Sequence, residues 1–590
     1  MVNVHISFVS DRSNQKRKHR SPVTATTYST YCVSRVNFIC PAQLSAVGIH
    51  LSGAENKIIM SGKEMITQEL CKESDMKDGE MREFEVQGQS ILLVRNNGVF
   101  SAVGNKCSHY GAPLSKGVLV GDRVRCPWHG ACFNVRNGDI EEFPGLDSLP
   151  CFKVTVENGS VCIVTSKKSL ENPKRIKPMK NRSSGDRSTV VIIGTGPAAL
   201  VCAETLRQEG YTGRIVMVTR EKDFPYDRTK LSKAMNAKAV DIYLRPIEFY
   251  KEHDLEVLTE KEAVSVNTDD ARVKFKDGSF LQYSQLLVAT GSMPRDLKCT
   301  GSTLQNVFYL RCPGDANAIS EAATGKNVVI MGSSFIGMEV AAFLSDKASS
   351  VSIIGRSDVP FQAVLGIQIG EVAMKLLKER GVNFYMRTEA REIRGSDGQV
   401  KEVILRNGTQ LPADVVVAGI GVMPVSTFLK GSRVAVDTRG AIYVDQFMRT
   451  SVPDVFAAGD VVSFPLAMMD GHRANIGHWQ MAHSHGRIAA LNMLNKQVSI
   501  NSVPFFWTSL LGKSIRYAGF GEGYTEIVMK GTLEDLKFLA FYLKDDYVVA
   551  VSSMNFDPVV AQVAEVIFSG KRITKKDVLA EDFINVITKL

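Results

Sequence analysis

The chain has 590 residues, of which 44% are hydrophobic and 23% are charged. This length predicts several domains that each bury a core, and the composition is ordinary for a globular protein in water. No apolar run reaches the roughly 18 residues that span a bilayer, so we expect no transmembrane segment.

The formal net charge of +9 is concentrated in two short stretches. Residues 1–54 contain six Lys or Arg and one acidic residue, and residues 167–187 contain eight and two. The rest of the chain is slightly acidic. Short basic runs are usually solvated, so we expect no specific nucleic-acid partner.

The first 66 residues, 1–66, are predicted to form a tail or a targeting segment. Their first 54 residues are rich in Ser, Thr and basic residues, which is typical of an organellar transit peptide. A disordered extension is the alternative, with Met60 or Met65 as a later start of the chain. The eleven cysteines follow no regular pattern and no convincing secretory signal opens the chain. We therefore expect a soluble intracellular protein of a reducing compartment, mitochondrial or cytoplasmic.

Residues 67–166 alternate apolar and polar residues around two Asn-Gly turns, which predicts a small all-β domain. Its loops hold two pairs of metal-binding residue types, Cys107 with His109 and Cys126 with His129. Two thiolates and two imidazoles can bind zinc or a two-iron, two-sulfur cluster, or belong to a structural loop without a ligand. Each loop supplies one residue of each kind, which favours the cluster, with both cysteines on one iron and both histidines on the other.

The motifs "CSHYGAP" and "CPWHG" resemble those of the Rieske family, ligand for ligand. Rieske proteins of respiratory chains carry an additional cysteine in each loop, and the two are joined as a disulfide. Here Ala112 and Trp128 stand at those positions, and Cys132 has no partner in the first loop. The resemblance therefore implies the ferredoxin-like group, at the low end of the Rieske potential range, roughly −150 mV.

The polar, basic stretch 167–187 predicts a flexible linker. After it, a strand, a glycine turn and a helix follow one another twice, which predicts two doubly wound α/β domains. In the first unit, Gly194 permits a tight turn, Gly196 admits a pyrophosphate at the helix N-terminus, and Ala199 completes the fingerprint. Glu221, beyond the next strand, is placed to accept a hydrogen bond from a ribose hydroxyl.

The second glycine turn, between Gly332 and Gly337, is predicted to bind the nicotinamide nucleotide. It has Ser334 where the fingerprint has its middle glycine, and a serine side chain can crowd the pyrophosphate. After the following strand, Gly355 replaces the acid that selects NAD, and Arg356 comes next. A guanidinium can pair with a 2′-phosphate, so we expect NADPH to be accepted at least as well as NADH, unless Asp358 binds the ribose.

Three further segments, "FPYDRTKLSK", "LLVATGSMPR" and "TSVPDVFAAGD", resemble FAD-binding signatures of the ferredoxin-reductase and apoptosis-inducing-factor flavoproteins. "HWQMAHSHG" and "VPFFWTS" match the flavin-side and C-terminal segments of that group. With the Rieske motifs in front, the chain is similar to the apoptosis-inducing-factor-like subfamily that joins a Rieske domain to this reductase. The implied organisation is a discontinuous FAD domain of residues 188–312 and 441–495, an NAD(P)H domain of residues 313–440, and an α+β C-terminal domain of residues 496–590.

The resemblance also implies roles for individual residues. Lys233 and Glu339 would form a buried pair beside the reacting flavin nitrogen, and they are the predicted catalytic residues. Asp460 would bind the ribityl or pyrophosphate part of FAD. Trp479 and Trp507 would line the flavin ring, or else be buried core residues. The remaining predicted cofactor contacts are Arg228 at the flavin, Val264 at the adenine, Thr290, Gly291 and Gly421.

Motifs and resemblance together imply an NAD(P)H-dependent oxidoreductase with FAD and a Rieske [2Fe-2S] cluster as cofactors. No redox-active cysteine pair follows the first nucleotide-binding helix, so we expect one-electron transfer from flavin to cluster and on to an unidentified acceptor protein.

Two alternatives stay open: a redox-controlled cell-death signalling protein with a slow reductase, and a component feeding an oxygenase, for which no 2-His-1-carboxylate site is evident. A metal at His478, His483 and His485 is not expected, because spacings of five and seven do not share one helix face.

Overall fold

The computed structural model describes residues 57–60 and 63–590. The predicted transit segment therefore lies outside the described residues. The first strands, β1 (Lys57–Met60) and β2 (Lys63–Lys72), pair with each other, and β2 pairs with a later strand of the Rieske domain. The strands of that domain thus begin before the predicted boundary at residue 67. No helix in the described part of the chain is long and apolar enough to cross a membrane.

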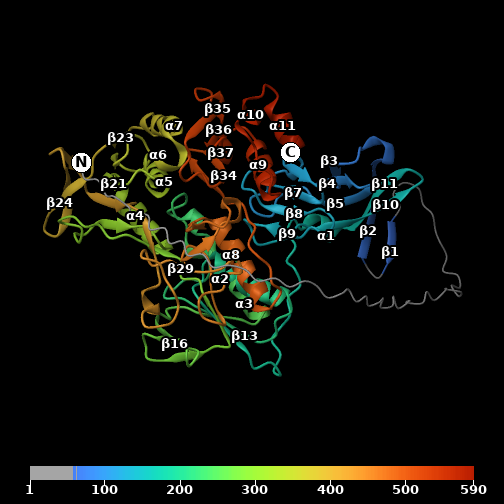
Figure 1. The fold of residues 1–590 in the computed structure, drawn as a ribbon, viewed down its shortest axis with the longest axis horizontal. Helices are drawn as coiled ribbons and strands as arrows, with labels where there is room; N and C mark the ends of the chain where they lie inside the picture. The colour runs from blue at the N-terminus through green and yellow to red at the C-terminus, as the bar shows by residue number, and fades with distance from the viewer. Residues whose placement is uncertain (1–56, 61–62) are drawn as a thin grey trace, which may run out of the picture. The chain divides into compact units, whose positions relative to one another are not determined.

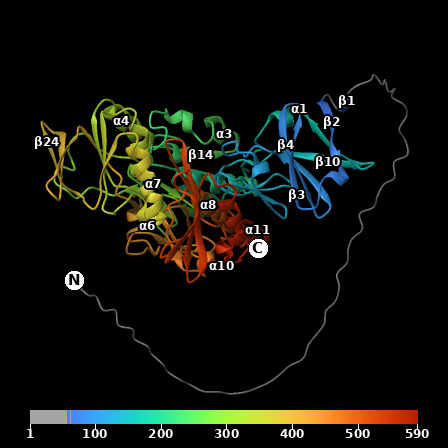
Figure 2. The same cartoon turned by 90° about the horizontal axis from the view of Figure 1, so that it is seen from above.

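The N-terminal domain consists of two antiparallel sheets (Figures 1 and 2). Asn97 and Asn158 have left-handed backbones and each is followed by a glycine of positive φ, which closes the two predicted hairpins. The larger sheet has the order β1-β2-β11-β10-β5-β4-β3 and the smaller one the order β6-β7-β8-β9. Their strands are β3 (Glu80–Val86), β4 (Gln89–Asn96), β5 (Val99–Gly104), β6 (Val118–Val120), β7 (Arg123–Arg125), β8 (Cys132–Asn134), β9 (Ile140–Glu142), β10 (Cys151–Glu157) and β11 (Ser160–Ser166).

Both sheets position the metal-binding residue types. The loop with Cys107 and His109 follows β5, and the loop with Cys126 and His129 connects β7 to β8. Both cysteines belong to a buried apolar cluster that includes Leu114. The loops are therefore anchored in the core of the domain.

The segment 167–187 is bound to both of its neighbours, although its composition predicts a flexible linker. Its first residues form the short helix α1 (Lys167–Glu171). Arg175 then exchanges two backbone hydrogen bonds with Ser148 of the Rieske domain. The backbone N–H of Arg182 donates to Asp254 of the next domain at 3.0 Å.

The predicted FAD domain is built on a five-stranded parallel sheet with the order β14-β13-β12-β18-β30. Its last strand is reached only after the chain has formed the second nucleotide domain, so this domain is discontinuous, as the order of the motifs predicts. Two helices pack together beside the sheet, α2 (Pro197–Gln208) and α8 (Trp479–Met493) (Figure 1). The strands are β12 (Thr189–Ile193), β13 (Arg214–Val218), β14 (Leu255–Leu258), β18 (Gln285–Val288) and β30 (Val455–Ala457).

The second nucleotide domain repeats this arrangement with the strand order β20-β27-β21-β22-β23. Its first strand precedes the predicted boundary at residue 313, so the domain begins earlier than the motifs suggest. Helix α5 (Phe335–Leu344) follows the second glycine turn, and α7 (Ile367–Lys378) precedes the edge strand β23. The strands are β20 (Val307–Tyr309), β21 (Asn327–Met331), β22 (Ser350–Ile354), β23 (Val382–Tyr385) and β27 (Val415–Ala418).

The C-terminal domain is a five-stranded antiparallel sheet with helices, the predicted α+β unit. Its apolar core joins the sheet to α9 (Val559–Phe568). The strands, in the sheet order, are β33 (Phe505–Leu510), β34 (Lys513–Gly519), β37 (Tyr547–Met554), β36 (Lys537–Lys544) and β35 (Glu526–Thr532). Two further helices end the chain, α10 (Lys575–Leu579) and α11 (Phe583–Lys589).

Candidate cluster and flavin sites

The two metal-binding loops have the same backbone geometry. In each loop the cysteine carbonyl accepts from the N–H of the glycine four residues later, Gly111 in the first and Gly130 in the second. In each, the cysteine N–H donates to the carbonyl five residues later. Both glycines have a φ of +76°, which favours glycine. Two turns of one geometry thus present two cysteines and two histidines.

The loops bring like side chains together. Cys107 and Cys126 are buried neighbours, and the hydrogen bond with Cys126 raises the pKa of the Cys107 thiol. The imidazoles of His109 and His129 lie with their ring centroids 5.0 Å apart. Among residues 57–60 and 63–590, no three Cys, His, Asp or Glu side chains are grouped as ligands of a single metal ion. A pair of sulfurs beside a pair of imidazoles is the arrangement that a Rieske cluster takes.

The protonation state of the histidines also fits a cluster. Burial lowers the pKa of His109 to about 4 and that of His129 to about 2, so both rings are neutral at pH 7. The Nδ1 atom of His109 is buried and has no hydrogen-bond partner. A neutral imidazole nitrogen with a free lone pair is a metal ligand, so these residues fit a [2Fe-2S] cluster.

The imidazoles face the reductase part of the chain. The indole of Trp507 in β33 lies 4.3 Å from the ring of His129 and 5.4 Å from that of His109, centroid to centroid. The resemblance implies Trp507 at the flavin ring, and in the structure it also lies against the predicted cluster ligands His109 and His129. A half-open cavity of about 330 Å³ lies at this junction, lined by Tyr110, Trp128, His129, Thr229, Lys230, Lys233, Trp507, Ser509, Ser514 and Arg516.

Lys233, one of the residues that line this cavity, is paired with Glu339 from α5. Lys233 Nζ lies 2.7 Å from the Glu339 carboxylate, whose side chain is 5% exposed. The hydroxyl of Thr508 donates to the same carboxylate at 2.7 Å, and Ser232 donates to it as well. The pair expected from the resemblance is therefore present, and Thr508, which donates to it, directly follows Trp507 in the chain. Its role at the flavin stays a prediction.

The first glycine turn leaves room for a phosphate group. A Cβ on Gly194 would lie 2.2 Å from the carbonyl oxygen of Ala289, so only glycine fits there. Gly196 is the N-cap of α2, and a Cβ on it would meet no atom within 4 Å. Ala199 is buried in the same helix. The free backbone N–H groups at this helix end fit a pyrophosphate.

Glu221 lies beyond β13, but its carboxylate already has partners. It accepts from Arg228 at 2.8 Å and from the Tyr226 hydroxyl at 2.7 Å. Burial acts to raise the pKa of Glu221, and the guanidinium of Arg228 outweighs it, so the pKa is lowered. Both residues predicted to contact FAD at this point, Glu221 and Arg228, therefore bind each other.

Arg311, after β20, is a candidate that the motifs did not indicate. Its guanidinium lies 3.1 Å from the Cβ position of Gly291. Burial, and then the neighbouring Arg228, lower the pKa of Arg311 to about 10, and no carboxylate among the described residues lies within ion-pair distance of it. A half-buried cation without an ion-pair partner fits the phosphates of FAD. A single arginine after a strand has no spacing that could have revealed it.

Three further predicted FAD contacts lie at the same sheet edge, and Val264 does not. Thr290 and Gly291 follow β18, and the Thr290 hydroxyl donates to the carbonyl of Val425 at 2.6 Å. Asp460 follows β30 and accepts from Ser292 at 2.9 Å. Val264 is the exception, since it lies in β15 (Ala263–Asn267) of a separate three-stranded sheet, where its side chain is exposed.

Trp479 is the first residue of helix α8, His478 is its N-cap, and His483 and His485 lie in its first half. The Trp479 ring packs on His483 at 5.0 Å. His478 packs on Phe506, and His485 accepts a hydrogen bond from the N–H of Gly459 at 3.3 Å. The three histidines thus have different neighbours, in agreement with their spacing.

The second glycine turn has the geometry of the first. A Cβ on Gly332 would lie 2.2 Å from the carbonyl oxygen of Gly419, and one on Gly337 would lie 2.0 Å from that of Gly332. Ser334 is the N-cap of α5, and its exposed side chain forms no capping hydrogen bond. The hydroxyl therefore stands where a pyrophosphate would approach. Gly421, after β27, has a φ of +102°.

Among the residues that follow β22, the side chain of Arg356 is available to bind a nucleotide. A Cβ on Gly355 would lie 2.5 Å from the Ser333 hydroxyl, so a larger residue there would have to displace that side chain. Arg356 is exposed and forms no ion pair with any described residue. Asp358, its competitor for the ribose, is already paired with Arg387.

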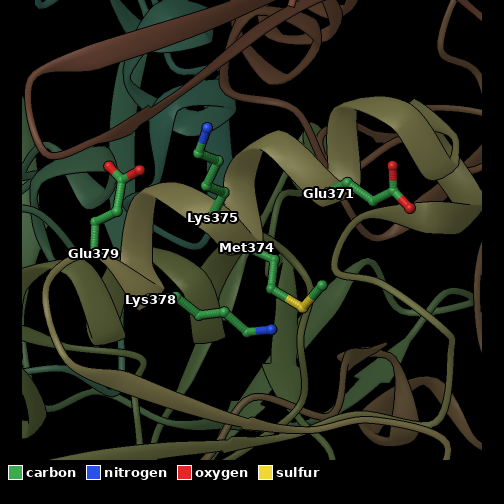
Figure 3. Close-up of a pocket in the computed structure, with 5 residues that line it drawn as sticks. All are labelled: Glu371, Met374, Lys375, Lys378 and Glu379. Atoms are coloured by element: carbon green, nitrogen blue, oxygen red, sulfur yellow. The ribbon is translucent and has the colours of Figure 1, made fainter. Parts of the chain in front are cut away.

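A separate hollow of about 500 Å³ lies along α7 and is lined by Glu371, Met374, Lys375, Lys378 and Glu379 (Figure 3). All five side chains come from one helix or its C-terminal end, and none of them is a predicted site residue. We assign no function to this hollow.

Comparison with known proteins identifies the family. The model of the family described as "Pyridine nucleotide-disulphide oxidoreductase" matches residues 188–486. The chain belongs to this oxidoreductase family. The Rieske [2Fe-2S] domain matches residues 67–153 of this oxidoreductase, and the reductase C-terminal domain matches residues 505–584.

The relatives of this oxidoreductase confirm the expected subfamily. Apoptosis-inducing factor 3 of Mus musculus is 49% identical over 523 residues, which cover 88% of this chain and 86% of that protein. The ferredoxin–NAD(+) reductase subunit of the benzene 1,2-dioxygenase system of Pseudomonas putida is 33% identical over 369 residues, 62% of this chain and 89% of that protein. The crystal structure of the covalent putidaredoxin reductase–putidaredoxin complex matches with a TM-score of 0.65 and 28% identity, over 68% of this chain and 99% of that one.

The predicted fold class and cofactors are confirmed by these matches. The chain is an NAD(P)H-dependent oxidoreductase with FAD and a Rieske [2Fe-2S] cluster, and a zinc site in the N-terminal domain is not supported. The individual cofactor contacts described above stay predictions.

Proposed function

We propose that this oxidoreductase carries electrons from NAD(P)H through FAD to its own Rieske cluster, and from there to a one-electron acceptor protein. The observation that supports this route is the contact between His129 and Trp507, whose ring centroids lie 4.3 Å apart. It joins a predicted cluster ligand to the wall of the cavity that also contains Lys233. When bound, FAD takes up a hydride and releases electrons singly, which suits a cluster that changes by one electron.

The residues of the chain would hold and orient these groups. The turn at Gly194 and Gly196 would hold the FAD pyrophosphate, with Arg311 as the cation beside it. Lys233, kept in place by Glu339, would donate a hydrogen bond at the flavin. Such pre-positioned groups orient a cofactor without rearrangement during the reaction.

The Rieske domain takes the place of a separate ferredoxin in this proposal. The putidaredoxin reductase structure is described as a covalent complex with putidaredoxin, and the dioxygenase relative is named as a ferredoxin reductase. Here the iron–sulfur domain is part of the same chain and contacts the reductase directly. The contacts include the Tyr110 hydroxyl, which donates to Asp227 at 2.9 Å, and Arg245, which pairs with Asp147 at 2.7 Å.

The experiment is a measurement of cofactor content and single-turnover reduction of the full-length protein. We expect stoichiometric FAD, two iron atoms and two acid-labile sulfides per chain, with cluster reduction following flavin reduction after NAD(P)H is added. Stoichiometric zinc without acid-labile sulfide, or a reduced flavin beside a cluster that stays oxidised, would contradict the proposal.

A second candidate function is redox-controlled cell-death signalling with a slow reductase. It is favoured by the name of the relative, apoptosis-inducing factor 3, and by the exposed Ser334 hydroxyl at the nucleotide turn. Steady-state NAD(P)H oxidation with an artificial one-electron acceptor separates the two functions, because a signalling protein would turn over slowly even at saturating nucleotide. A mitochondrial or cytoplasmic location is proposed for either function.

A further inference from the structure

The second ligand loop, residues 126–130, is held by the C-terminal domain as well as by the Rieske domain. Arg125, which directly precedes Cys126, is 1% exposed, and its Nε donates to Glu565 of α9 at 2.5 Å. The Glu565 side chain is 5% exposed. A residue 440 positions away along the chain therefore binds the residue that directly precedes the loop.

Arg125 transmits this contact across the whole loop. Its Nη1 donates to the carbonyl of Gly130, at the far end of the loop, at 2.8 Å. Its Nη2 is paired with Glu142 of β9. The planar guanidinium thus fixes both ends of the loop at once, and Glu565 fixes the guanidinium.

The C-terminal domain touches the loop at three more points. Arg516 Nε donates to the carbonyl of Trp128 at 3.0 Å. The ring of Phe505 lies against Gly130, where an added Cβ would lie 2.6 Å from a ring carbon. Trp507 packs on His129 at 4.3 Å.

The first ligand loop is held differently. The Ser108 hydroxyl donates to the carbonyl of Asp147 within the Rieske domain at 2.6 Å. Tyr110 donates to Asp227 in the FAD domain. In the described part of the chain, the C-terminal domain forms hydrogen bonds and ion pairs with the second ligand loop and with Arg125 directly before it. Among the described residues, it forms none with the first ligand loop.

We propose that the C-terminal domain completes the housing of the cluster, with Glu565 and Arg516 as positioning residues for the second ligand loop. The inference rests on the cluster assigned above and goes beyond the electron route. Both residues carry charge within this housing. Reduction adds a negative charge to the cluster. A nearby carboxylate therefore disfavours reduction, and a nearby guanidinium favours reduction.

The two charges predict opposite effects. Glu565→Gln removes a negative charge and should shift the cluster midpoint potential to more positive values. Arg516→Gln removes a positive charge beside His129 and should shift it to more negative values. Merely structural damage to the loop would not produce shifts of opposite sign.

The test is an EPR-monitored redox titration of the full-length protein and these two variants. Glu526→Gln is the matched control, because Glu526 lies in the same domain, is exposed to solvent and pairs with Lys575 at 2.7 Å. We expect opposite shifts for the two variants, no shift for the control, and unchanged flavin absorbance in all three.

An unchanged midpoint in both variants, shifts in one direction, or an equal shift in Glu526→Gln would overturn the inference. If Glu565→Gln does not retain flavin, Arg516→Gln alone decides the test. An unchanged or more positive midpoint potential of the cluster in Arg516→Gln then overturns the inference. A wild-type protein without a cluster signal would instead contradict the cofactor assignment, so the two failures are distinguishable.

Discussion

The indole of Trp507 packs on the imidazole of His129, with the ring centroids 4.3 Å apart. Trp507 belongs to the C-terminal domain, and His129 belongs to a Rieske loop that is distant in the sequence. The same cavity contains Lys233, which pairs with Glu339. The contact therefore links the predicted ligands of the cluster to the predicted flavin side.

Replacing Trp507 tests this link. We expect Trp507→Ala to slow cluster reduction by about tenfold to a hundredfold, because a displacement of about 1 Å at a reacting pair can cost about a hundredfold in rate. Flavin reduction by NAD(P)H should stay within a factor of about two. Stopped-flow absorbance resolves the two phases. Trp128→Ala is the control, since the Trp128 ring lies farther from His129, at 6.5 Å, and is partly exposed. Equal slowing in both variants would remove the special role of Trp507.

The pair of Lys233 and Glu339 should be important for stability as well as for reduction of the flavin. Glu339→Ala removes the acceptor of three hydrogen bonds and leaves Lys233 without its partner. We expect the free energy of unfolding to fall by about 3 kcal/mol, at the low end for buried pairs because Lys233 is partly exposed. Urea denaturation measures this change. Asp277→Asn, at the exposed pair with Lys261, should leave the unfolding midpoint unchanged. A loss no larger than that of the control would show that the pair is not a structural requirement.

The nucleotide preference depends on Arg356 in our interpretation. Arg356→Ala should lower kcat/KM for NADPH by about tenfold and leave that for NADH almost unchanged, because a hydrogen-bonded charge pair contributes about 1.5 kcal/mol or more. The comparison variant is Arg406→Ala, which removes an exposed arginine of the same domain that pairs with Glu389. A strong NADH preference that Arg356→Ala does not alter would identify Arg356 as a solvated loop residue.

Buried histidines in α8 should make the protein less stable in weak acid. Burial lowers the pKa of His478 to about 4 and that of His485 to about 3. In the unfolded chain both have a pKa near 6.5, so unfolding takes up protons below that pH. Their stabilising effect is complete above about pH 6.5 and declines as the pH falls towards 4, by about 1 kcal/mol per residue between pH 7.5 and 5.5.

Urea denaturation at these two pH values, in wild type and in His485→Gln, measures the effect. The variant should have a smaller difference between the two midpoints than wild type. His472→Gln, at an exposed histidine, should retain the full difference. The histidine explanation fails if His485→Gln and wild type respond to pH identically.

Local patterns in the sequence could predict much of this fold. The Asn-Gly turns gave the hairpins of the Rieske domain, and the two glycine turns gave the nucleotide domains, because each signal lies within a few consecutive residues. The Lys233–Glu339 pair was predicted from the resemblance to the flavoprotein family. The position of Trp507 and the isolated guanidinium of Arg311 could not be foreseen, since both depend on how distant segments pack. The contact of Glu565 with Arg125 joins residues 440 positions apart, and no periodicity encodes it.

The most direct test of the proposed electron route is rapid-freeze EPR of the full-length protein mixed anaerobically with NAD(P)H, compared with the same protein from which FAD has been removed. We predict that the signal of the reduced cluster develops only in the protein that contains FAD, after the flavin absorbance has bleached. Reduction of the cluster at the same rate in the flavin-free protein would contradict the route from nicotinamide through FAD to the cluster.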